Sequence, residues 1–472
     1  MTSLSRHLLT SWVRLGPRFL PFADAASPGL PLSRLLRLSL FQVSVGMALV
    51  LMLGTLNRVM IVELGVPASL VAVVIALPVI YAPMRALIGF KSDHHRSALG
   101  WRRVPYMWMG TMIQFGGLAI MPFALLVLSG GGDAGRWPAW IGQAAAALAF
   151  LLVGAGLHTT QTAGLALAND QAAPDRQPRV VGLMYVMLLL GTMGSALLFG
   201  WLLRDFSPGR LVQVIQGAAV ATLVLNAVAL WQQETRDPQR VARWRERPAR
   251  EPDFREAWRA FVAHDGSARR LAAIGLGTLA FGMQDVLIEP YGGQVLQMGV
   301  GQTTWLTATL AAGGLCGFGL ASRLLGKGGE PVRLALQAAL LGVPAFAAIT
   351  VAAPAQWLAL FVAGVAAIGF AAGLFGHATL TLTMNRAPKD QAGLALGAWG
   401  AVQATAAGVG VALGGILRDA FGALAAQGSL GPALAVPATG FAAVYLMEIV
   451  LLGATAVVLW PLLTSPPARP AP

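Results

Sequence analysis

Charged side chains inside long apolar segments are the first candidates for chemistry in this sequence. A charge in the hydrocarbon core of a membrane is costly unless it is paired, so each one is a candidate functional residue. Six residues meet this description: Arg58, Glu63, Arg85, Asp285, Glu289 and Glu448.

These charges have different expected partners. Arg58 and Asp285 occupy corresponding positions in the first and seventh apolar segments. We expect them to approach each other across a central cavity and to pair, the alternative being that both extend to the membrane interface. Arg85 lies near the end of its segment, where a long side chain usually extends to the interface. Glu448 lies near mid-segment and is expected to be protonated or to contact another protein.

Two histidines lie inside apolar segments, each beside threonines. His158 begins the sequence His-Thr-Thr-Gln-Thr, and His377 is followed by three alternating threonines. A neutral imidazole can bind a metal, including the central ion of a tetrapyrrole. It can equally form a hydrogen bond to a neighbouring helix. Both histidines are therefore candidate pigment ligands, with interhelical hydrogen bonding as the alternative.

Other kinds of chemistry are not indicated. The single cysteine, Cys316, excludes a disulfide or a cysteine-based metal site within one chain. The six histidines show no metal-binding spacing, and the sequence has no P-loop, nucleophile elbow or dinucleotide-binding glycine motif. We therefore expect no resident protein-bound metal site and no enzyme activity.

The composition indicates an all-α polytopic membrane protein. Of 472 residues, 56% are hydrophobic and 11% are charged, and the mean hydropathy is +0.67. Soluble proteins carry about 25% charged residues, so a soluble domain is excluded. Spans of about 20 residues predict twelve transmembrane helices. The expected spans are Leu38–Asn57, Leu64–Met84, Val104–Gly132, Trp137–Asn169, Val180–Leu203, Leu211–Gln233, one from Leu271, one within Pro290–Ser322, two within Leu334–Asn385, Gln391–Leu417 and Ala435–Leu463.

The positive charges predict the orientation. With this order of spans, 27 of the 33 Lys and Arg residues fall on one side and four on the other. Positive residues concentrate on the cytoplasmic side, so both termini are expected there. The net charge of +13 then reflects topology and attraction to anionic lipid, and nucleic acid is not an expected partner.

The chain divides into two similar halves. We expect a cytoplasmic tail at 1–36 without a signal peptide, six-helix halves at 37–233 and 271–463, and a tail at 464–472. The basic linker 234–270 contains an expected amphipathic helix at Asp253–His264. Ala155-Gly156-Leu157 recurs at 372–374, and the Arg-Asp pair at 204–205 recurs at 418–419. Two repeated six-helix halves resemble the major facilitator superfamily.

A loop motif supports this fold. The second and third spans are joined by a segment with Gly89, Asp93, Gly100, Arg102 and Arg103. It resembles the superfamily motif of that loop, with a longer spacing between Asp93 and Gly100. Such an aspartate caps a helix or pairs with a basic residue across the gate between the halves. The alternative is a solvated basic loop that only sets topology.

A more specific motif points to one family. The stretch Gln284-Asp285-x3-Glu289-Pro290-Tyr291-Gly-Gly, together with the loop motif and Ala168-Asn169-Asp170, resembles the PucC/LhaA family, also called the bacteriochlorophyll delivery family. The resemblance covers about Leu36 to Leu463. Within the family, LhaA is associated with the light-harvesting complex LH1 and PucC with LH2.

The resemblance implies a function in photosynthesis. The expected role is a non-enzymatic assembly factor that escorts light-harvesting α/β polypeptides or delivers bacteriochlorophyll, bound or transient, in the bacterial inner (intracytoplasmic photosynthetic) membrane. The nascent LH1 ring and pigment-synthesis enzymes are further expected partners, and the tail before Leu36 favours LH1 as the client. The alternative function is a proton-coupled transporter of a small amphipathic molecule, with Glu63, Asp285, Glu289 or Glu448 as the proton site.

Overall fold

The computed structural model describes residues 25–464, except 28, 94, 96, 98, 174–175, 235–265, 353, 356 and 387–391. The expected amphipathic helix at Asp253–His264 and most of both tails lie outside the described residues. Within them the chain is almost entirely helical, as expected, and the β structure is a single bridge between Ser27 and Leu30.

The first half begins with an irregular span. α3 (Leu32–Leu38) and α4 (Leu40–Leu49) lead into two wide π-type segments, η2 (Val50–Thr55) and η3 (Val59–Glu63), which flank α5 (Leu56–Arg58). The other elements of this half are α6 (Ala68–Ala76), η4 (Leu77–Ile80), α7 (Tyr81–Asp93), α8 (Val104–Leu128), η5 (Gly132–Arg136), α9 (Ala139–Gln171), α10 (Gln177–Leu202) and α11 (Pro208–Leu230).

The second half also begins with an interrupted span. α14 (Ser267–Gly282) passes through the 3-10 turn η6 (Met283–Val286) into α15 (Ile288–Gln294). The following elements are α16 (Val300–Gly326), α17 (Pro331–Ala352), α18 (Leu358–Asn385), α19 (Ala392–Ala426), η8 (Pro432–Leu434) and α20 (Ala438–Thr464).

The described helices account for the expected twelve spans. Eleven are long and apolar enough to cross a membrane. The twelfth is formed by α6, η4 and α7, in place of the continuous helix expected at Leu64–Met84. Gly65 adopts a positive φ of 65° before the span begins. Pro78 then lies in η4, where a missing N–H and the ring disfavour a regular helix.

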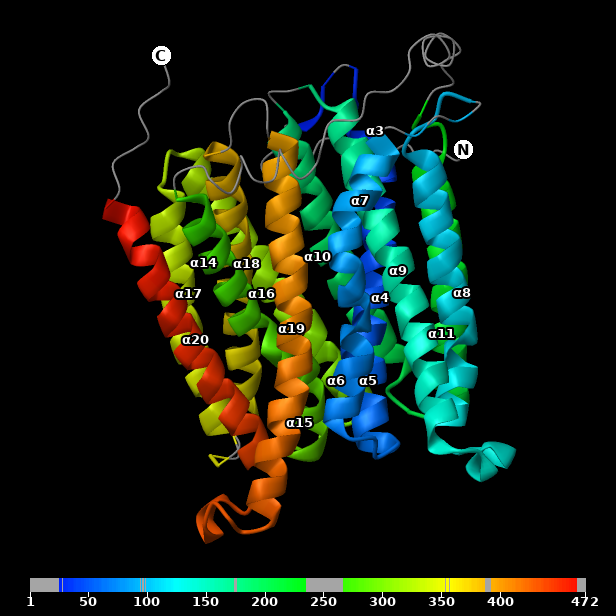
Figure 1. Ribbon diagram of the computed structural model, residues 1–472, viewed down its shortest axis with the longest axis vertical. Helices are drawn as coiled ribbons and strands as arrows, with labels where there is room; N and C mark the ends of the chain where they lie inside the picture. The colour runs from blue at the N-terminus through cyan, green and yellow to red at the C-terminus, as the bar shows by residue number, and fades with distance from the viewer. Residues whose placement is uncertain are drawn as a thin grey trace, which may run out of the picture.

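The two halves lie side by side with their helices roughly parallel to one axis, as Figure 1 shows by the blue-to-green and green-to-red colours. The first described residues and Thr464 lie at the same end of the bundle, which we call the terminal face. Across the boundary between the halves, α10 packs on α16 and α6 packs on α19. Gly415 permits the second contact, because a Cβ there would overlap Ala72.

Candidate functional site

The family motif lies where the seventh span is interrupted. Gln284 and Asp285 are in the η6 turn, and Glu289 is in the first turn of α15. The Gln284 side chain donates to the Phe281 carbonyl at 3.1 Å and to the Asp285 carboxylate. From the first half, Asn57 donates to the Val286 carbonyl at 2.8 Å. The interrupted parts of the first and seventh spans therefore meet, as the repeat predicts.

Arg58 does not pair with Asp285, so that prediction is wrong. Among the described residues, buried Arg58 forms an ion pair with Glu63 and donates to the Met298 carbonyl at 3.3 Å. Residues five apart do not share a face of an α-helix. The π-type η3 segment between them has an i to i+5 bonding pattern, which brings Glu63 to the same side as Arg58.

Glu289 is buried at the boundary between the halves. Its carboxylate accepts a hydrogen bond from Thr307 of α16. Gly54 of η2 lies directly against the same carboxylate, because a Cβ at Gly54 would overlap Glu289 Oε1. Next to this contact, the hydroxyl oxygens of Thr55 and Thr304 are 3.4 Å apart. The Glu289 carboxyl of the second half therefore occupies the space that a side chain at Gly54 of the first half would fill.

Pro290 and Tyr291 of the family motif are structural. Both are buried in α15. The Tyr291 ring packs within 5.1 Å of Phe361 and 5.2 Å of Phe441, measured between ring centroids, and its hydroxyl donates to the Ile349 carbonyl at 3.2 Å. These contacts fix α15 inside the second half.

Glu448 of α20 is fully buried next to the interrupted seventh span. Neither of its carboxyl oxygens has a hydrogen-bond partner among the described residues. The Asp285 carboxyl and the backbone of Gln284 lie near it. The burial fits the expectation of a protonated carboxyl better than that of a partner contact, because the side chain is not on the surface.

A second polar cluster lies in the first half, on α7 and α9. Arg85 Nε donates to Thr162 Oγ1 at 3.2 Å, and Arg85 Nη2 donates to Gln161 Oε1 at 2.9 Å. The arginine therefore binds α9 instead of extending to the interface, which corrects the expectation for this residue. Its recorded partners are neutral, so its positive charge has no acidic partner among the described residues.

His158 belongs to the same cluster. It lies one turn before Thr162 on α9, is half-buried, and is near Arg85. Its Nδ1 atom has no hydrogen-bond partner among the described residues. Tyr185 of α10 is also near Arg85, and its ring meets that of Trp399 in the second half at 6.2 Å.

His377 has a different environment. It is 8% exposed in α18, and its ring packs on that of Phe318 with centroids 4.2 Å apart. Two residues further along α18, Thr379 accepts a hydrogen bond from Trp399 Nε1 at 3.3 Å. Of the two candidate ligands, His158 has the more exposed side chain.

The loop motif forms a network within the first half. Arg103 donates to Asp170 Oδ2 at 3.0 Å, to the Gly89 carbonyl at 3.3 Å and to Ser92 Oγ at 2.5 Å. Arg102 reaches the same Asp170 oxygen at 3.4 Å. Asp93 is the last residue of α7, and its side chain lies outside the described residues. The expected pairing of Asp93 across the gate therefore stays a prediction.

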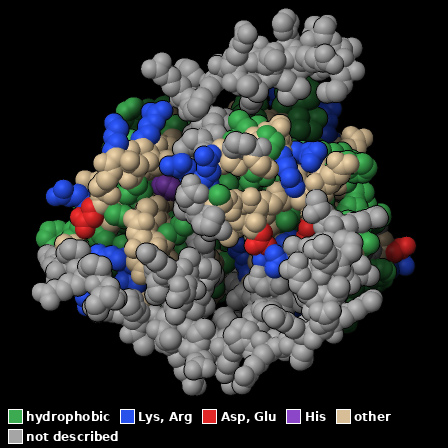
Figure 2. Space-filling view, turned by 90° about the horizontal axis from the view of Figure 1, so that it is seen from above, with side chains coloured by type: hydrophobic (Ala, Val, Ile, Leu, Met, Phe, Trp, Pro, Cys, Tyr) green, Lys and Arg blue, Asp and Glu red, His purple; other side chains and the backbone are tan. Residues whose placement is uncertain are grey.

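Two acids are central to this network: Asp170, named from the sequence only as part of the Ala168-Asn169-Asp170 motif, and Glu234, which was not singled out from the sequence. Asp170 ends the Ala-Asn-Asp stretch of α9, and Glu234 follows α11. The Glu234 carboxylate accepts from the backbone N–H groups of Arg102 and Arg103 at 2.7 and 3.1 Å, and it caps the start of α8. Gly100 turns the chain before this cap with a φ of 77°. Figure 2 shows Lys and Arg side chains spread over the described part of the terminal face.

The site has no indication of a metal centre made by the protein alone. Among the described residues, no three His, Cys, Asp or Glu side chains gather as a metal site would require. The arrangement instead offers one imidazole nitrogen, one arginine and amide groups, which bind polar groups of a ligand.

Comparisons with known proteins identify relatives over nearly the whole chain. The family model described as PUCC protein matches residues 55–466. A protein named Protein PucC from Rhodovulum sulfidophilum is 62% identical over 420 residues, which is 89% of this chain and 92% of that protein. Protein PucC of Rhodobacter capsulatus is 58% identical, over 91% of this chain and 92% of its own. A protein of the same species, named bacteriochlorophyll synthase 44.5 kDa chain, is 28% identical over 82% and 87%.

Two solved structures that share the fold are transporters. A bacterial homologue of the human lysosomal transporter Spinster, in an inward-facing and unoccupied conformation, matches with a TM-score of 0.68 and 15% identity, covering 91% of this chain and 96% of that one. The nucleoside transporter NupG matches with a TM-score of 0.60 and 14% identity, covering 91% and 98%. These matches establish the transporter-type fold. Together with the family match, they show that this chain is a membrane-spanning member of the PucC protein family.

Proposed function

We propose that the protein is a non-enzymatic assembly factor for a bacterial light-harvesting complex. It delivers bacteriochlorophyll, escorts the α/β polypeptides, or does both, within the inner photosynthetic membrane. Family membership supports this role, and the bias of Lys and Arg to one side supports cytoplasmic termini. One relative carries bacteriochlorophyll synthase in its name, which associates that relative with the pigment.

The observation that carries the proposal is the unbonded Nδ1 of His158 beside Arg85. A buried polar atom without a partner is costly, so the site favours a ligand that satisfies it. Bacteriochlorophyll, when bound, would supply a magnesium ion that takes a nitrogen ligand and carbonyl groups that accept hydrogen bonds. His158 would hold the metal, while Arg85, oriented by Gln161 and Thr162, would donate to a ring oxygen.

The names of the relatives bear on the choice of client. The sequence expectation favoured LH1 because of the tail before Leu36. The relatives named Protein PucC, at 62% and 58% identity, carry the name that the resemblance links to LH2. We therefore place LH2 first as the client and LH1 second.

A proton-coupled transporter is the second candidate, because the fold neighbours are transporters. The buried Glu448, which lacks a hydrogen-bond partner among the described residues, is the strongest proton site. Glu63 is weaker, since it is paired with Arg58 and its side chain is 36% exposed.

The test is purification of the protein in mild detergent from a phototrophic host, followed by an absorption spectrum and a protein gel. Bacteriochlorophyll absorption with copurifying small polypeptides is the expected result, and deleting the gene should deplete LH2 more than LH1. Colourless protein without small polypeptides, combined with uptake driven by a pH gradient in liposomes, would overturn the assembly role in favour of transport.

A further inference from the structure

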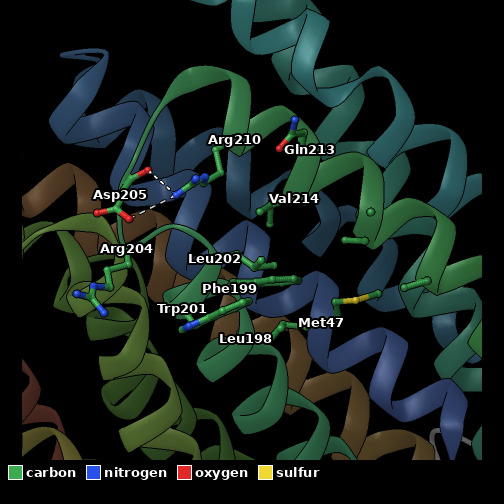
Figure 3. Close-up of a pocket in the computed structure, with 13 residues that line it drawn as sticks. Met47, Leu198, Phe199, Trp201, Leu202, Arg204, Asp205, Arg210, Gln213 and Val214 are labelled. Carbon is green, nitrogen blue, oxygen red and sulfur yellow. Dashed lines mark hydrogen bonds and ion pairs between the residues drawn. The ribbon is translucent and has the colours of Figure 1, made fainter.

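A lipid-facing groove lies between α10 and α11, near the end of the bundle opposite the terminal face. Its cavity volume is about 640 Å³, within the range of about 300–1,000 Å³ usual for small-molecule sites. Apolar side chains line most of it, and Figure 3 shows Phe199, Leu202 and Val214 around the hollow with Met47 of α4 beyond them. Trp201 at its edge is 63% exposed.

α4 joins α10 and α11 by close contacts at Ser44 and Gly46. A Cβ at Gly46 would come within 2.7 Å of the Thr192 backbone nitrogen, so α4 and α10 are in direct backbone contact there. On its other side, Ser44 of α4 donates to Asn226 of α11 at 2.8 Å. Over their whole length, α10 and α11 pack on each other much less than on α4, and the groove lies between them.

Charged residues stand at one end of this apolar groove. Arg210 Nη1 donates to the Asp205 carbonyl at 3.2 Å and lies 3.7 Å from its carboxylate, with Asp205 86% exposed (Figure 3). Arg204 also lines the groove, and its side chain has no ion pair among the described residues. The rim thus carries two positive charges against one negative charge. It holds two of the four basic residues expected on this side of the membrane.

We propose that the groove binds an anionic diacyl phospholipid. The apolar wall takes an acyl chain, and Arg204 and Arg210 bind the headgroup phosphate, for which the planar guanidinium is well suited. Trp201 lies where aromatic side chains meet the headgroup level. A ligand with a long chain and a negative head matches both parts of the groove, whereas a neutral pigment matches only the apolar part. This inference does not depend on the proposed function.

The first test closes the groove without touching its rim. Gly217 lines the groove, and a Cβ there has open space around it, so Gly217→Phe should fill the hollow while the protein folds. Gly194 of α10 also has open space and lies outside the groove, which makes Gly194→Phe the matched control. Native mass spectrometry with added phosphatidylglycerol should show about tenfold fewer lipid adducts for Gly217→Phe and no change for the control.

The second test removes the headgroup contacts. The unaltered protein should retain phosphatidylglycerol about tenfold better than zwitterionic phosphatidylethanolamine, as two arginines at an anionic head predict. In the double variant Arg204→Gln/Arg210→Gln this preference should disappear. Equal retention of the two lipids by the unaltered protein would overturn the proposal, as would phosphatidylglycerol binding that Gly217→Phe leaves intact. Displacement of the lipid by bacteriochlorophyll would overturn it in favour of a pigment tail.

Discussion

Gly54 lies against the carboxylate of Glu289, so closely that a Cβ at position 54 would overlap Oε1. The two residues belong to different halves of the protein. Gly54 lies in the π-type segment η2, and Glu289 lies in the first turn of α15, just after the 3-10 turn η6 that interrupts the seventh span. The contact joins the irregular part of the first span to the family motif.

Gly54→Ala should therefore destabilise the protein. The methyl group must displace Glu289 and weaken its hydrogen bond to Thr307, and overpacking of this kind costs about 1–3 kcal/mol. Thermal unfolding in detergent should show a lower transition temperature. Gly116→Ala in α8, where a Cβ meets nothing within 4 Å, is the control and should unfold no earlier than the unaltered protein. Equal behaviour of the two variants would show that Glu289 moves freely.

Glu448→Met should raise the transition temperature. The change replaces a fully buried carboxyl, whose oxygens have no hydrogen-bond partner among the described residues, by an apolar side chain of similar length. Glu289→Met should have the opposite effect, since Thr307 would lose its acceptor. Loss of stability in Glu448→Met would mean that the nearby backbone of Gln284 stabilises the carboxyl.

Asp170→Asn should lower the stability of the first half, because it disrupts the network at the terminal face. It removes the negative charge that faces Arg103, whose side chain is 5% exposed, and charge-assisted hydrogen bonds contribute about 1.5–3 kcal/mol. Chemical unfolding would measure the loss. Asp133→Asn, at an exposed residue of η5, should change the midpoint little. A null result at Asp170 would assign the stability of this face to the Glu234 cap instead.

Composition and charge distribution were enough to predict the fold class and the span order, and the internal repeat predicted that the first and seventh spans meet. The pairing of Arg58 with Glu63 was not predictable, because it depends on the π-type segment η3, which no residue pattern in the sequence indicates. Arg85 was misplaced for a related reason. Its distance from a span end suggested the interface, but Thr162 and Gln161 on a neighbouring helix hold it inside.

Asp170 and Glu234 show a further limit of sequence reasoning. Each lies at a helix end, and its role depends on which other helix end stands beside it. The motif Ala-Asn-Asp drew attention to Asp170, whereas nothing around Glu234 distinguished it from the other charges of the linker. Distances across the bundle, such as 2.7 Å from Glu234 to the backbone of Arg102, come from packing alone.

His158→Leu should abolish pigment binding if His158 holds bacteriochlorophyll. The variant loses the imidazole nitrogen but keeps an apolar side chain of moderate size, so pigment absorbance per protein should fall by at least about tenfold. His377→Leu is the control, because its ring is packed on Phe318 at 4.2 Å and is nearly buried. It should lose stability and keep its pigment. Arg85→Gln should retain part of the pigment with a shifted absorption maximum, since it removes a hydrogen-bond donor and not the ligand. Gel filtration would show whether the His158→Leu protein is folded. Full pigment absorbance in the folded variant would mean that His158 is not the pigment ligand.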